Sequence, residues 1–257
     1  MRGLDRSDER VVLHRDGTHD AAIWSWVRHD YPSLPAAFAP GDVVLDIGCH
    51  TGGFADLAAQ RGATVIAYEA NRANHALAAM NLACHAQVAV HYGAVWRSDE
   101  TVRHDLLFTP SADAANTGGG SVLYESLDAH WSAIPGLGHI APPPEAALVA
   151  HPVPTVALDD VLRPAGRVRF LKIDVEGAEF PILLTATRLD LVDEIAGEYH
   201  SLTNEQMESI APCARAASTC YSEDLLRAHL ERAGFRVAMT PTAGGRGLFT
   251  ATRHLAG

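Results

Sequence analysis

The 257-residue chain lacks the features that mark several protein classes. It has no apolar run near the ~20 residues that span a bilayer, and no apolar stretch of the signal-peptide kind near its N-terminus. Its 4 cysteines are scattered without a CxxC pair, which disfavours a disulfide framework or zinc knuckle and predicts a reducing, cytoplasmic location. The net charge of −11 disfavours binding to a polyanion such as DNA. We therefore expect a soluble protein with a small-molecule partner, and no nucleic-acid or membrane partner.

Apolar runs alternate with helical patterns along much of the chain. Strands are predicted at residues 43–48, 64–69, 88–95, 168–175, 194–200, 235–239 and 247–252, and helices at residues 54–61, 71–85, 181–191 and 222–233. Because strand, helix and strand follow one another at short spacing, right-handed crossovers and a largely parallel sheet are expected. The composition, 47% hydrophobic and 20% charged, fits a single α/β domain over residues 1–257.

The middle of the chain interrupts this alternation. Residues 96–152 contain "NTGGGS", "GLGH" and "APPPEAA" and have weak periodicity, so we expect an insertion or lid there. Within it, residues 101–108 and 121–124 are predicted to pair as a hairpin. The core sheet is then expected to come from residues 40–95 and 153–257.

The N-terminal residues 1–40 are predicted to form a helical segment. Trp24, Trp26 and Tyr31 are interpreted as packing anchors within it, and Asp20 as the cap of its helix. Such a segment can cover an active site or contribute to a homodimer.

Glycines follow the first predicted strand directly, in "LDIGCHTGGF" at residues 45–54. In open α/β sheets, ligands bind at the carboxyl ends of strands where the strand order reverses. Gly48 and Gly52 allow the backbone to approach such a ligand. The pattern is not the G-x-G-x-x-G of dinucleotide sites, and the carboxylate of Asp46 suits a cation rather than a pyrophosphate. S-adenosylmethionine, which carries an ammonium, a sulfonium and no phosphate, is therefore favoured over NAD as the cofactor.

The second predicted strand ends in another acid, Glu69, within "YEANRAN". A carboxylate at this position can accept both ribose hydroxyls. Singly, Asp46 or Glu69 could merely cap a loop, whereas together they favour a nucleoside site. Asn71 either shapes the turn or contacts the ligand, and topology places the adenine ring near Ala94, at the end of the third strand.

Four charges crowd the end of an apolar run in "RFLKIDVEGAEFPIL", residues 169–183. Side chains alternate between the faces of a strand, so Lys172, Asp174 and Glu176 are predicted to share one face. Lys172 is expected to pair with a carboxylate, and Glu179 to begin the next helix, where its charge suits the helix dipole. We therefore expect these charges at the mouth of the ligand crevice rather than in the core.

Several short motifs occur together in an order that resembles a known family. They are "VVLDIGCHTGGF", "YEANRAN", "NTGGGS", "VALDDVL", "LKIDVEGAE" and "EYH". Over residues 40–200 the chain resembles FkbM-family methyltransferases, although "YEAN" has no proline after its glutamate and the insertion is enlarged. The resemblance implies a class I, Rossmann-like fold: a mixed seven-stranded sheet with helices on both faces. It also implies S-adenosylmethionine-dependent methyl transfer, usually to oxygen on sugars or secondary metabolites.

Methyl transfer to an alcohol needs alignment, a dry pocket and a base, because the cofactor already activates the methyl group. The strand end "GEYH" brings Glu198 and His200 to the same edge as Asp174. His200, with an ordinary pKa of about 6.5, is the first candidate for the base, and Asp174 is its rival. Alternatively, Asp174, Glu198 and His200 could hold Mg or Mn, although no diagnostic metal spacing is present.

The predicted site residues fall into three sets. The catalytic set is His200, Asp174 and Glu198. The cofactor-binding set is Asp46, Gly48, Cys49, Gly52, Phe54, Glu69, Ala70, Asn71, Ala94, Asp174 and Glu176. The substrate-binding set is Asn116, Gly118, Glu176 and His200. Two other functions stay open, an N-methyltransferase acting on a small amine and a nucleoside-binding module without catalysis.

Overall fold

The computed structural model describes residues 11–29, 35, 37–126 and 150–253. Tyr31 and residues 127–149 of the expected lid lie outside the described residues. Within the described ranges, no helix is both long enough and apolar enough to cross a bilayer.

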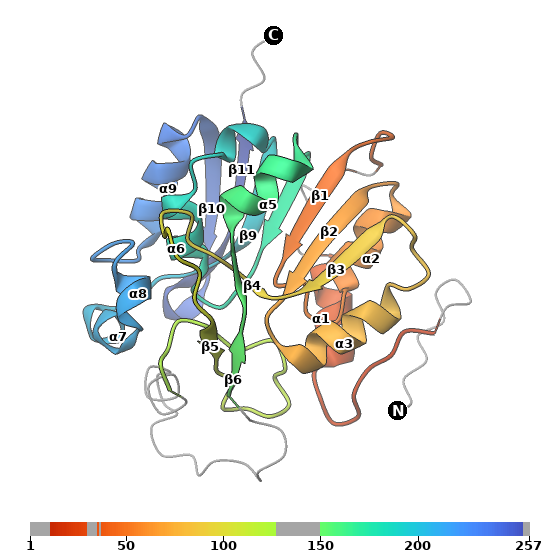
Figure 1. The fold of residues 1–257 in the computed structure, drawn as a ribbon, viewed down its shortest axis with the longest axis horizontal. Helices are drawn as coiled ribbons and strands as arrows, with labels where there is room; N and C mark the ends of the chain where they lie inside the picture. The colour runs from red at the N-terminus through yellow and green to blue at the C-terminus, as the bar shows by residue number, and fades with distance from the viewer. Residues whose placement is uncertain (1–10, 30–34, 36, 127–149, 254–257) are drawn as a thin grey trace.

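A seven-stranded sheet with the order β10-β11-β9-β8-β1-β2-β3 forms the centre of the fold (Figure 1). Its strands are β1 (Val43–Ile47), β2 (Thr64–Glu69), β3 (Val88–Tyr92), β8 (Phe170–Ile173), β9 (Glu194–His200), β10 (Phe235–Pro241) and β11 (Arg246–Arg253). β11 is antiparallel to both of its neighbours, and the other pairs are parallel. The sheet is therefore mixed, as the family resemblance implied.

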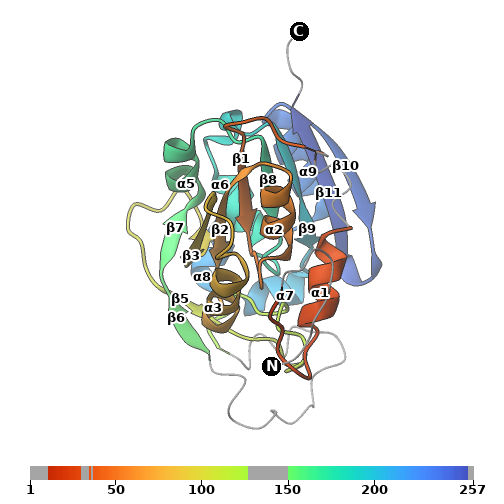
Figure 2. The same cartoon turned by 90° about the vertical axis from the view of Figure 1, so that its right-hand side faces the viewer.

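Helices cover both faces of the sheet (Figure 2). On one face lie α1 (Asp20–Val27), α2 (Gly53–Gln60) and α3 (Arg72–Asn81), and on the other α5 (Leu158–Ala165), α6 (Glu179–Thr185) and α9 (Glu223–Arg232). The remaining short helices are η1 (Leu189–Leu191), α7 (Asn204–Ser209), α8 (Pro212–Arg215) and η2 (Ala243–Gly245).

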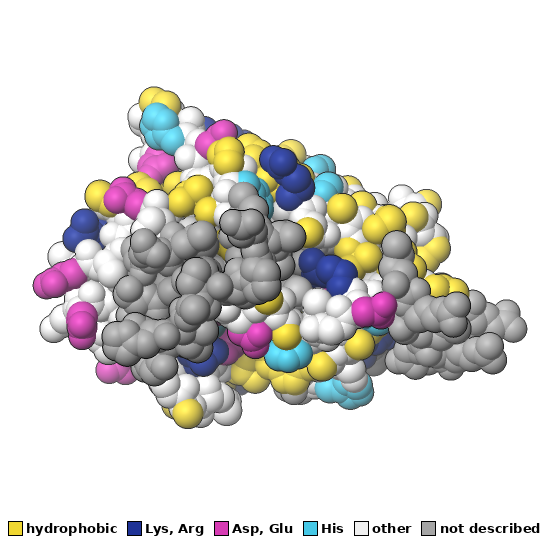
Figure 3. Space-filling model, turned by 90° about the horizontal axis from the view of Figure 1, so that it is seen from below, with side chains coloured by type: hydrophobic (Ala, Val, Ile, Leu, Met, Phe, Trp, Pro, Cys, Tyr) yellow, Lys and Arg dark blue, Asp and Glu magenta, His cyan; other side chains and the backbone are white. Residues whose placement is uncertain are grey.

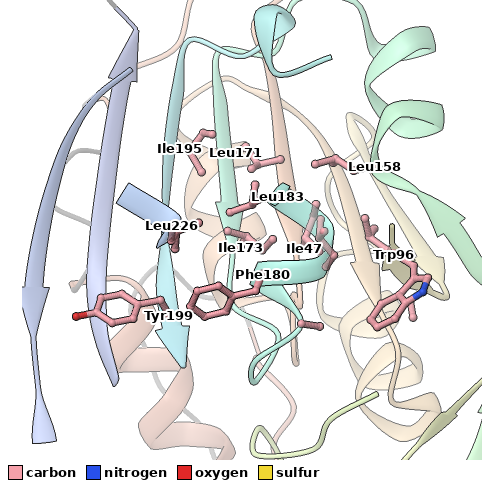
Figure 4. Packing of buried hydrophobic residues seen from close by; sticks show 14 of the residues in the cluster. Ile47, Trp96, Leu158, Leu171, Ile173, Phe180, Leu183, Ile195, Tyr199 and Leu226 are labelled. Atoms are coloured by element: carbon pink, nitrogen blue, oxygen red, sulfur yellow. The ribbon is translucent and has the colours of Figure 1, made fainter. Parts of the chain in front are cut away.

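The alternation of side chains along each strand divides the core into two clusters. Leu45 and Ile47 of β1 belong to the cluster under α5, α6 and α9, whereas Val44 belongs to the cluster under α2. Figure 4 shows the first cluster, with Phe180 and Leu183 of α6 against the sheet. Because both faces of these central strands are buried, they are apolar almost throughout.

The expected third strand divides at Gly93. Its second part, β4 (Ala94–Trp96), leaves the main sheet and pairs in parallel with β7 (Thr155–Ala157). The predicted hairpin of residues 101–108 and 121–124 is wrong. β5 (Leu106–Phe108) pairs instead with β6 (His151–Val153).

The hairpin is reduced to a single bridge between Thr109 and Ser121, which exchange two backbone hydrogen bonds of 2.8 Å. The bridge is isolated, so within the described residues these two segments do not form a continuous ladder.

The parallel strands bring their carboxyl ends to one edge of the sheet, the lower edge in Figure 1. In the register of β1 with β8, Asp46 lies opposite Lys172. Figure 3 views the molecule from this edge, where acidic and histidine side chains lie among hydrophobic ones. The predicted cofactor and catalytic residues thus come together at one edge.

Candidate active site

A cavity of about 200 Å³ lies at this edge. It is bounded by the turns after β1, β2 and β8, by the end of β9, by α1 and by residues 116–122. Most of the predicted site residues line it: Gly48, Cys49, Phe54, Glu69, Ala70, Ala94, Asn116, Gly118, Asp174, Glu176 and Glu198. Within the described part of the chain, Asp46, Gly52, Asn71 and His200 are not among the lining residues.

The glycines of the first turn make room for the protein itself. A Cβ on Gly48, which has a φ of 79°, would lie 1.9 Å from the carbonyl oxygen of Asp174. A Cβ on Gly52, with a φ of 98°, would lie 2.8 Å from Leu82 Cδ1. Close packing of the turn against the chain that follows β8 and against the end of α3 therefore also requires glycine at these two positions.

Asp46 is fully buried behind the turn rather than facing the cavity. Its Oδ1 lies 3.3 Å from Lys172 Nζ, which also donates a 2.6 Å hydrogen bond to the Gly48 carbonyl oxygen. Burial lowers the pKa of Lys172, but the charges of Asp46 and Asp174 outweigh it and raise the pKa above its ordinary value. The ion pair of Lys172 and Asp46 therefore holds the glycine-rich turn in place.

Glu69 lines the cavity and is held by the backbone on both sides. Its Oε2 accepts the His50 N–H and its Oε1 accepts the Asn71 N–H, both at 2.8 Å. Burial raises the pKa of Glu69 to about 7, although these hydrogen bonds oppose the rise. Asn71 caps α3 by accepting the Ala73 N–H at 2.9 Å, which fits the turn-shaping alternative for this residue.

The charged run after β8 is only partly at the cavity. Asp174 and Glu176 line it, whereas Lys172, which also borders it, and Glu179 are almost completely buried. β8 ends at Ile173 and Glu176 has a φ of 53°, so the strand alternation stops before the run does. The charges therefore do not all lie at the mouth of the crevice. Lys172 pairs with the carboxylate of Asp46, as expected, and Glu179 accepts the Val175 N–H in the core.

His200 lies behind the cavity in a cage of carboxylates. Its Nδ1 lies 3.3 Å from Glu179 Oε1, and its Nε2 lies 3.3 Å from Glu176 Oε2 and 3.9 Å from Glu198 Oε1. Burial lowers the pKa of His200, but Glu179 and Glu176 raise it well above the ordinary value. The carboxylates beside both ring nitrogens favour the protonated imidazole, which cannot accept a proton, and so disfavour His200 as the general base.

Glu198 has the environment that His200 lacks. Its side chain lines the cavity, and burial followed by the charge of Asp174 raises its pKa to about 7, against the opposing charge of His200. Burial also raises the pKa of Asp174. A carboxylate that is about half ionised at neutral pH can accept a proton there.

The three residues considered as metal ligands, Asp174, Glu198 and His200, do not form a metal site. Within the part of the chain that the structure describes, no group of three or more His, Cys, Asp or Glu side chains has an arrangement that could hold a metal ion. Both ring nitrogens of His200 lie against carboxylates, and these favour the protonated ring, which has no lone pair to give to a metal. The metal alternative therefore has no support from the geometry.

Sequence reasoning missed other lining residues. His50 and Asn74 line the cavity without having been predicted. Trp24 and Trp26, interpreted mainly as packing anchors of a segment that can cover an active site, line it too, as does Thr117, beside the predicted Asn116 and Gly118. Trp24 is buried and Trp26 is 41% exposed. His50 lies inside "LDIGCHTGGF" and Thr117 inside "NTGGGS". Both could therefore have been predicted as site residues from these two motifs.

Residues 46–237 match the methyltransferase FkbM domain. The chain belongs to the FkbM methyltransferase family. It is therefore an S-adenosylmethionine-dependent methyltransferase, and its strand order is that of the class I, Rossmann-like fold. The predictions of family, fold class and enzyme class are confirmed. No curated protein matches this FkbM methyltransferase by sequence.

Solved structures of other methyltransferases resemble the chain at low identity. The N-terminal domain of EvdMO1, in the presence of SAH and D-fucose, is 16% identical with a TM-score of 0.47, over 98% of this chain and 89% of that one. Precorrin-6y C5,15-methyltransferase from Geobacter metallireducens GS-15 is 10% identical with a TM-score of 0.42, over 96% and 95%. An O-methyltransferase family protein from Burkholderia thailandensis is 9% identical with a TM-score of 0.44, over 93% and 57%.

The residues around the cavity fit S-adenosylmethionine. Glu69, Asp174, Glu176 and Glu198 give the cavity a carboxylate lining, whereas the ammonium of Lys172 is engaged by Gly48 and Asp46. This set of donors and acceptors suits a cation that has no phosphate and would repel a pyrophosphate. Apolar side chains, including Ile47, Val95 and Phe108, complete the lining and offer surface for a purine ring.

Proposed function

We propose that this FkbM methyltransferase methylates a hydroxyl oxygen on a sugar or secondary metabolite. S-adenosylmethionine supplies the activated methyl group when it is bound. The observation that carries the proposal is the placement of Glu198 at the cavity beside Asp174, with a pKa of about 7. A hydroxyl acceptor has to lose its proton as it reacts, and Glu198 is suited to take it.

Glu69 is the proposed anchor for the ribose of the cofactor. Its two oxygens each accept one backbone N–H, and an ionised carboxylate has about four lone-pair positions. Glu69 can therefore still accept hydrogen bonds from the two ribose hydroxyls. Gly48, Cys49, Phe54, Ala70 and Ala94 are proposed to form the rest of the cofactor surface, because they also line the cavity. Asp46 supports that surface from behind through Lys172.

Asp174 and Glu176 are proposed to orient the acceptor, with Asn116 and Gly118 on the facing segment. Trp26 lines the cavity and leaves part of its ring exposed, which suits stacking on the apolar face of a sugar or an aromatic ring. His200 holds Glu176 in place as a cation, since its Nε2 lies 3.3 Å from Glu176 Oε2.

Methylation of an amine nitrogen is the second candidate, and the carboxylate lining is the observation that favours it. Asp174, Glu176 and Glu198 would attract an ammonium group. An amine also has to give up a proton before it reacts, so Glu198 would serve the same purpose. The acceptor atom distinguishes the two candidates.

The test is a methylation assay with S-adenosylmethionine and a panel of glycosides, hydroxylated aromatic compounds and amines. Products are detected by a methyl-sized mass increase, and NMR locates the methyl group. We expect O-methylated products and production of S-adenosylhomocysteine. Exclusive N-methylation would establish the second candidate. Tight cofactor binding without turnover on any acceptor class would support a nucleoside-binding module without catalysis.

A further inference from the structure

Asp20 is a fully buried carboxylate whose role lies outside the proposed chemistry. It was expected to cap α1, yet it makes no capping hydrogen bond there. Its Oδ2 accepts the Arg15 backbone N–H at 3.0 Å and Arg15 Nε at 2.8 Å. Its Oδ1 accepts Arg15 Nη2 at 2.9 Å and the Thr117 hydroxyl at 2.6 Å. Asp20 therefore joins the N-terminal segment to the "NTGGGS" segment.

Thr117 passes this link on to His50. The Thr117 hydroxyl donates its proton to Asp20, because a carboxylate can only accept. Thr117 Oγ1 therefore acts as the acceptor for His50 Nε2, which lies 2.8 Å away. His50 is thus held as the tautomer with the proton on Nε2. It is also neutral, because burial lowers its pKa to about 4 even though the charge of Asp20 opposes this.

His50 in turn holds the cofactor end of the cavity. Its φ of 53° is in the left-handed region, which a residue other than glycine enters only when its surroundings hold it there. The His50 backbone N–H donates to Glu69 Oε2, and its ring is held by Thr117. A chain of hydrogen bonds thus runs from Asp20 through Thr117 and His50 to Glu69.

Asn74 of α3 closes this chain into a ring. Arg15 Nη2 donates to Asn74 Oδ1 at 2.6 Å, and Asn74 Nδ2 donates to the Thr117 carbonyl oxygen at 2.9 Å. Asn74 is almost completely buried, and both Asn74 and Thr117 line the cavity. The hydrogen bonds fix α1, α3, the "NTGGGS" segment and the glycine-rich turn to one another.

We propose that Asp20 is a positioning residue for cofactor binding: through Thr117 and His50 it holds Glu69 and the glycine-rich turn in the geometry that receives the nucleoside. The same contacts keep α1 against the cavity, where Ile23, Trp24 and Trp26 form part of its wall. Asp20 itself does not line the cavity in the described part of the chain, so it acts through these neighbours. The role is independent of the acceptor.

The test compares variants of the full chain by calorimetric titration with S-adenosylmethionine and with S-adenosylhomocysteine. Asp20→Asn removes the charge, and Thr117→Val removes the hydroxyl while keeping the shape. We expect each to weaken cofactor binding by about tenfold or more, as for loss of a charge-assisted hydrogen bond. We expect kcat at saturating cofactor to change by less than about threefold, because the loss is in binding. Thr117→Ser retains the hydroxyl and is expected to restore affinity.

Asp56→Asn is the matched control. Asp56 is also a buried carboxylate that ties the end of α1 to the core, through Arg28 Nη1 at 2.6 Å and His85 Nε2 at 2.8 Å. It is expected to lower the melting temperature without changing cofactor affinity. Wild-type affinity in folded Asp20→Asn and Thr117→Val would overturn the proposal, as would equal weakening by Asp56→Asn. If Asp20→Asn fails to fold, the Thr117→Val and Thr117→Ser pair decides the outcome alone.

Discussion

Lys172 Nζ lies 3.3 Å from Asp46 Oδ1 across the register of β8 and β1, and both side chains are buried. The lysine also donates to the Gly48 carbonyl oxygen at 2.6 Å. A charged pair in the core of a parallel sheet is costly to desolvate, so its two members depend on each other. The pair fixes the turn that forms one wall of the cavity, which ties the stability of the fold to the shape of the site.

Lys172→Met is expected to lower the free energy of unfolding by about 3–5 kcal/mol, because it leaves the Asp46 carboxylate buried without its cation. Urea denaturation measures the change. Arg167→Met is the control, because Arg167 pairs with Asp193 at 2.6 Å but is 64% exposed. That control is expected to cost less than about 1 kcal/mol. Equal losses in the two variants would contradict the buried-pair argument.

The sequence predicted Glu69 correctly as a residue of the cavity, because an acid directly after the second strand of such a sheet has few other places to lie. It mispredicted the surroundings of Asp46. The prediction for Asp46 used only the pattern of its own strand. Its orientation depends on Lys172, which lies opposite it on β8. Strand pairing decides which buried charges meet, and a single sequence does not contain that register.

The contact of Asp20 with Thr117 could not be predicted from local patterns, because it joins distant parts of the chain. Asp20 and Thr117 are 97 positions apart in the sequence, and His50 and Thr117 are 67 apart. An acid at the start of a helix ordinarily caps it, and that local preference was overridden when Arg15 and Thr117 offered stronger donors. Local patterns predicted the elements, and long-range packing determined the partners of these polar side chains.

Glu69→Gln is expected to weaken the binding of S-adenosylmethionine by about tenfold or more. The amide group of glutamine presents an N–H where the carboxylate accepts the His50 or Asn71 N–H. Titration calorimetry measures the affinity, and kcat at saturating cofactor is expected to stay within about twofold. Asp42→Asn, at the amino end of β1, serves as the control and should bind the cofactor normally. Unchanged affinity in Glu69→Gln would remove Glu69 from the cofactor site.

Treatment with a chelator is expected to leave the rate of methyl transfer within about twofold of the untreated enzyme. The reason is the arrangement of Asp174, Glu198 and His200, which gives no three-ligand site within the described residues. The measurement is the initial rate after incubation with EDTA and removal of the chelator. A loss of rate that added Mg²⁺ or Mn²⁺ restores would show that a metal takes part.

Glu198→Gln is expected to lower kcat by about 10²–10⁴-fold with little effect on cofactor affinity, since an amide cannot accept the proton. In the wild type, Glu198 has to be ionised to act, so the rate is expected to rise with pH and to level off above about 7. Glu194→Gln is the control, because Glu194 lies at the other end of β9 and pairs with Arg169 at 2.6 Å. Wild-type turnover in Glu198→Gln would exclude this residue as the base.

His200→Gln is expected to shift the rising limb of that pH profile to higher pH. The positive charge of His200 lowers the pKa of Glu198, so its removal raises that pKa and requires a higher pH to ionise the base. The stability of the fold gives a second readout. Because the pKa of His200 is raised in the folded state, its ion pairs stabilise the wild type fully below about pH 6.5 and lose this effect as pH rises through the folded value.

The His200→Gln variant lacks these ion pairs, so its loss of stability relative to the wild type should be largest at acidic pH and should decrease as the pH rises. Thermal unfolding across the pH range measures the deficit, and initial rates at the same pH values measure the limb. If the rising limb of the pH–rate profile keeps its wild-type position in His200→Gln, His200 carries no charge beside Glu198. If the rising limb moves to lower pH, His200 raises the pKa of Glu198 in the wild type. The carboxylates around His200 would then need another explanation.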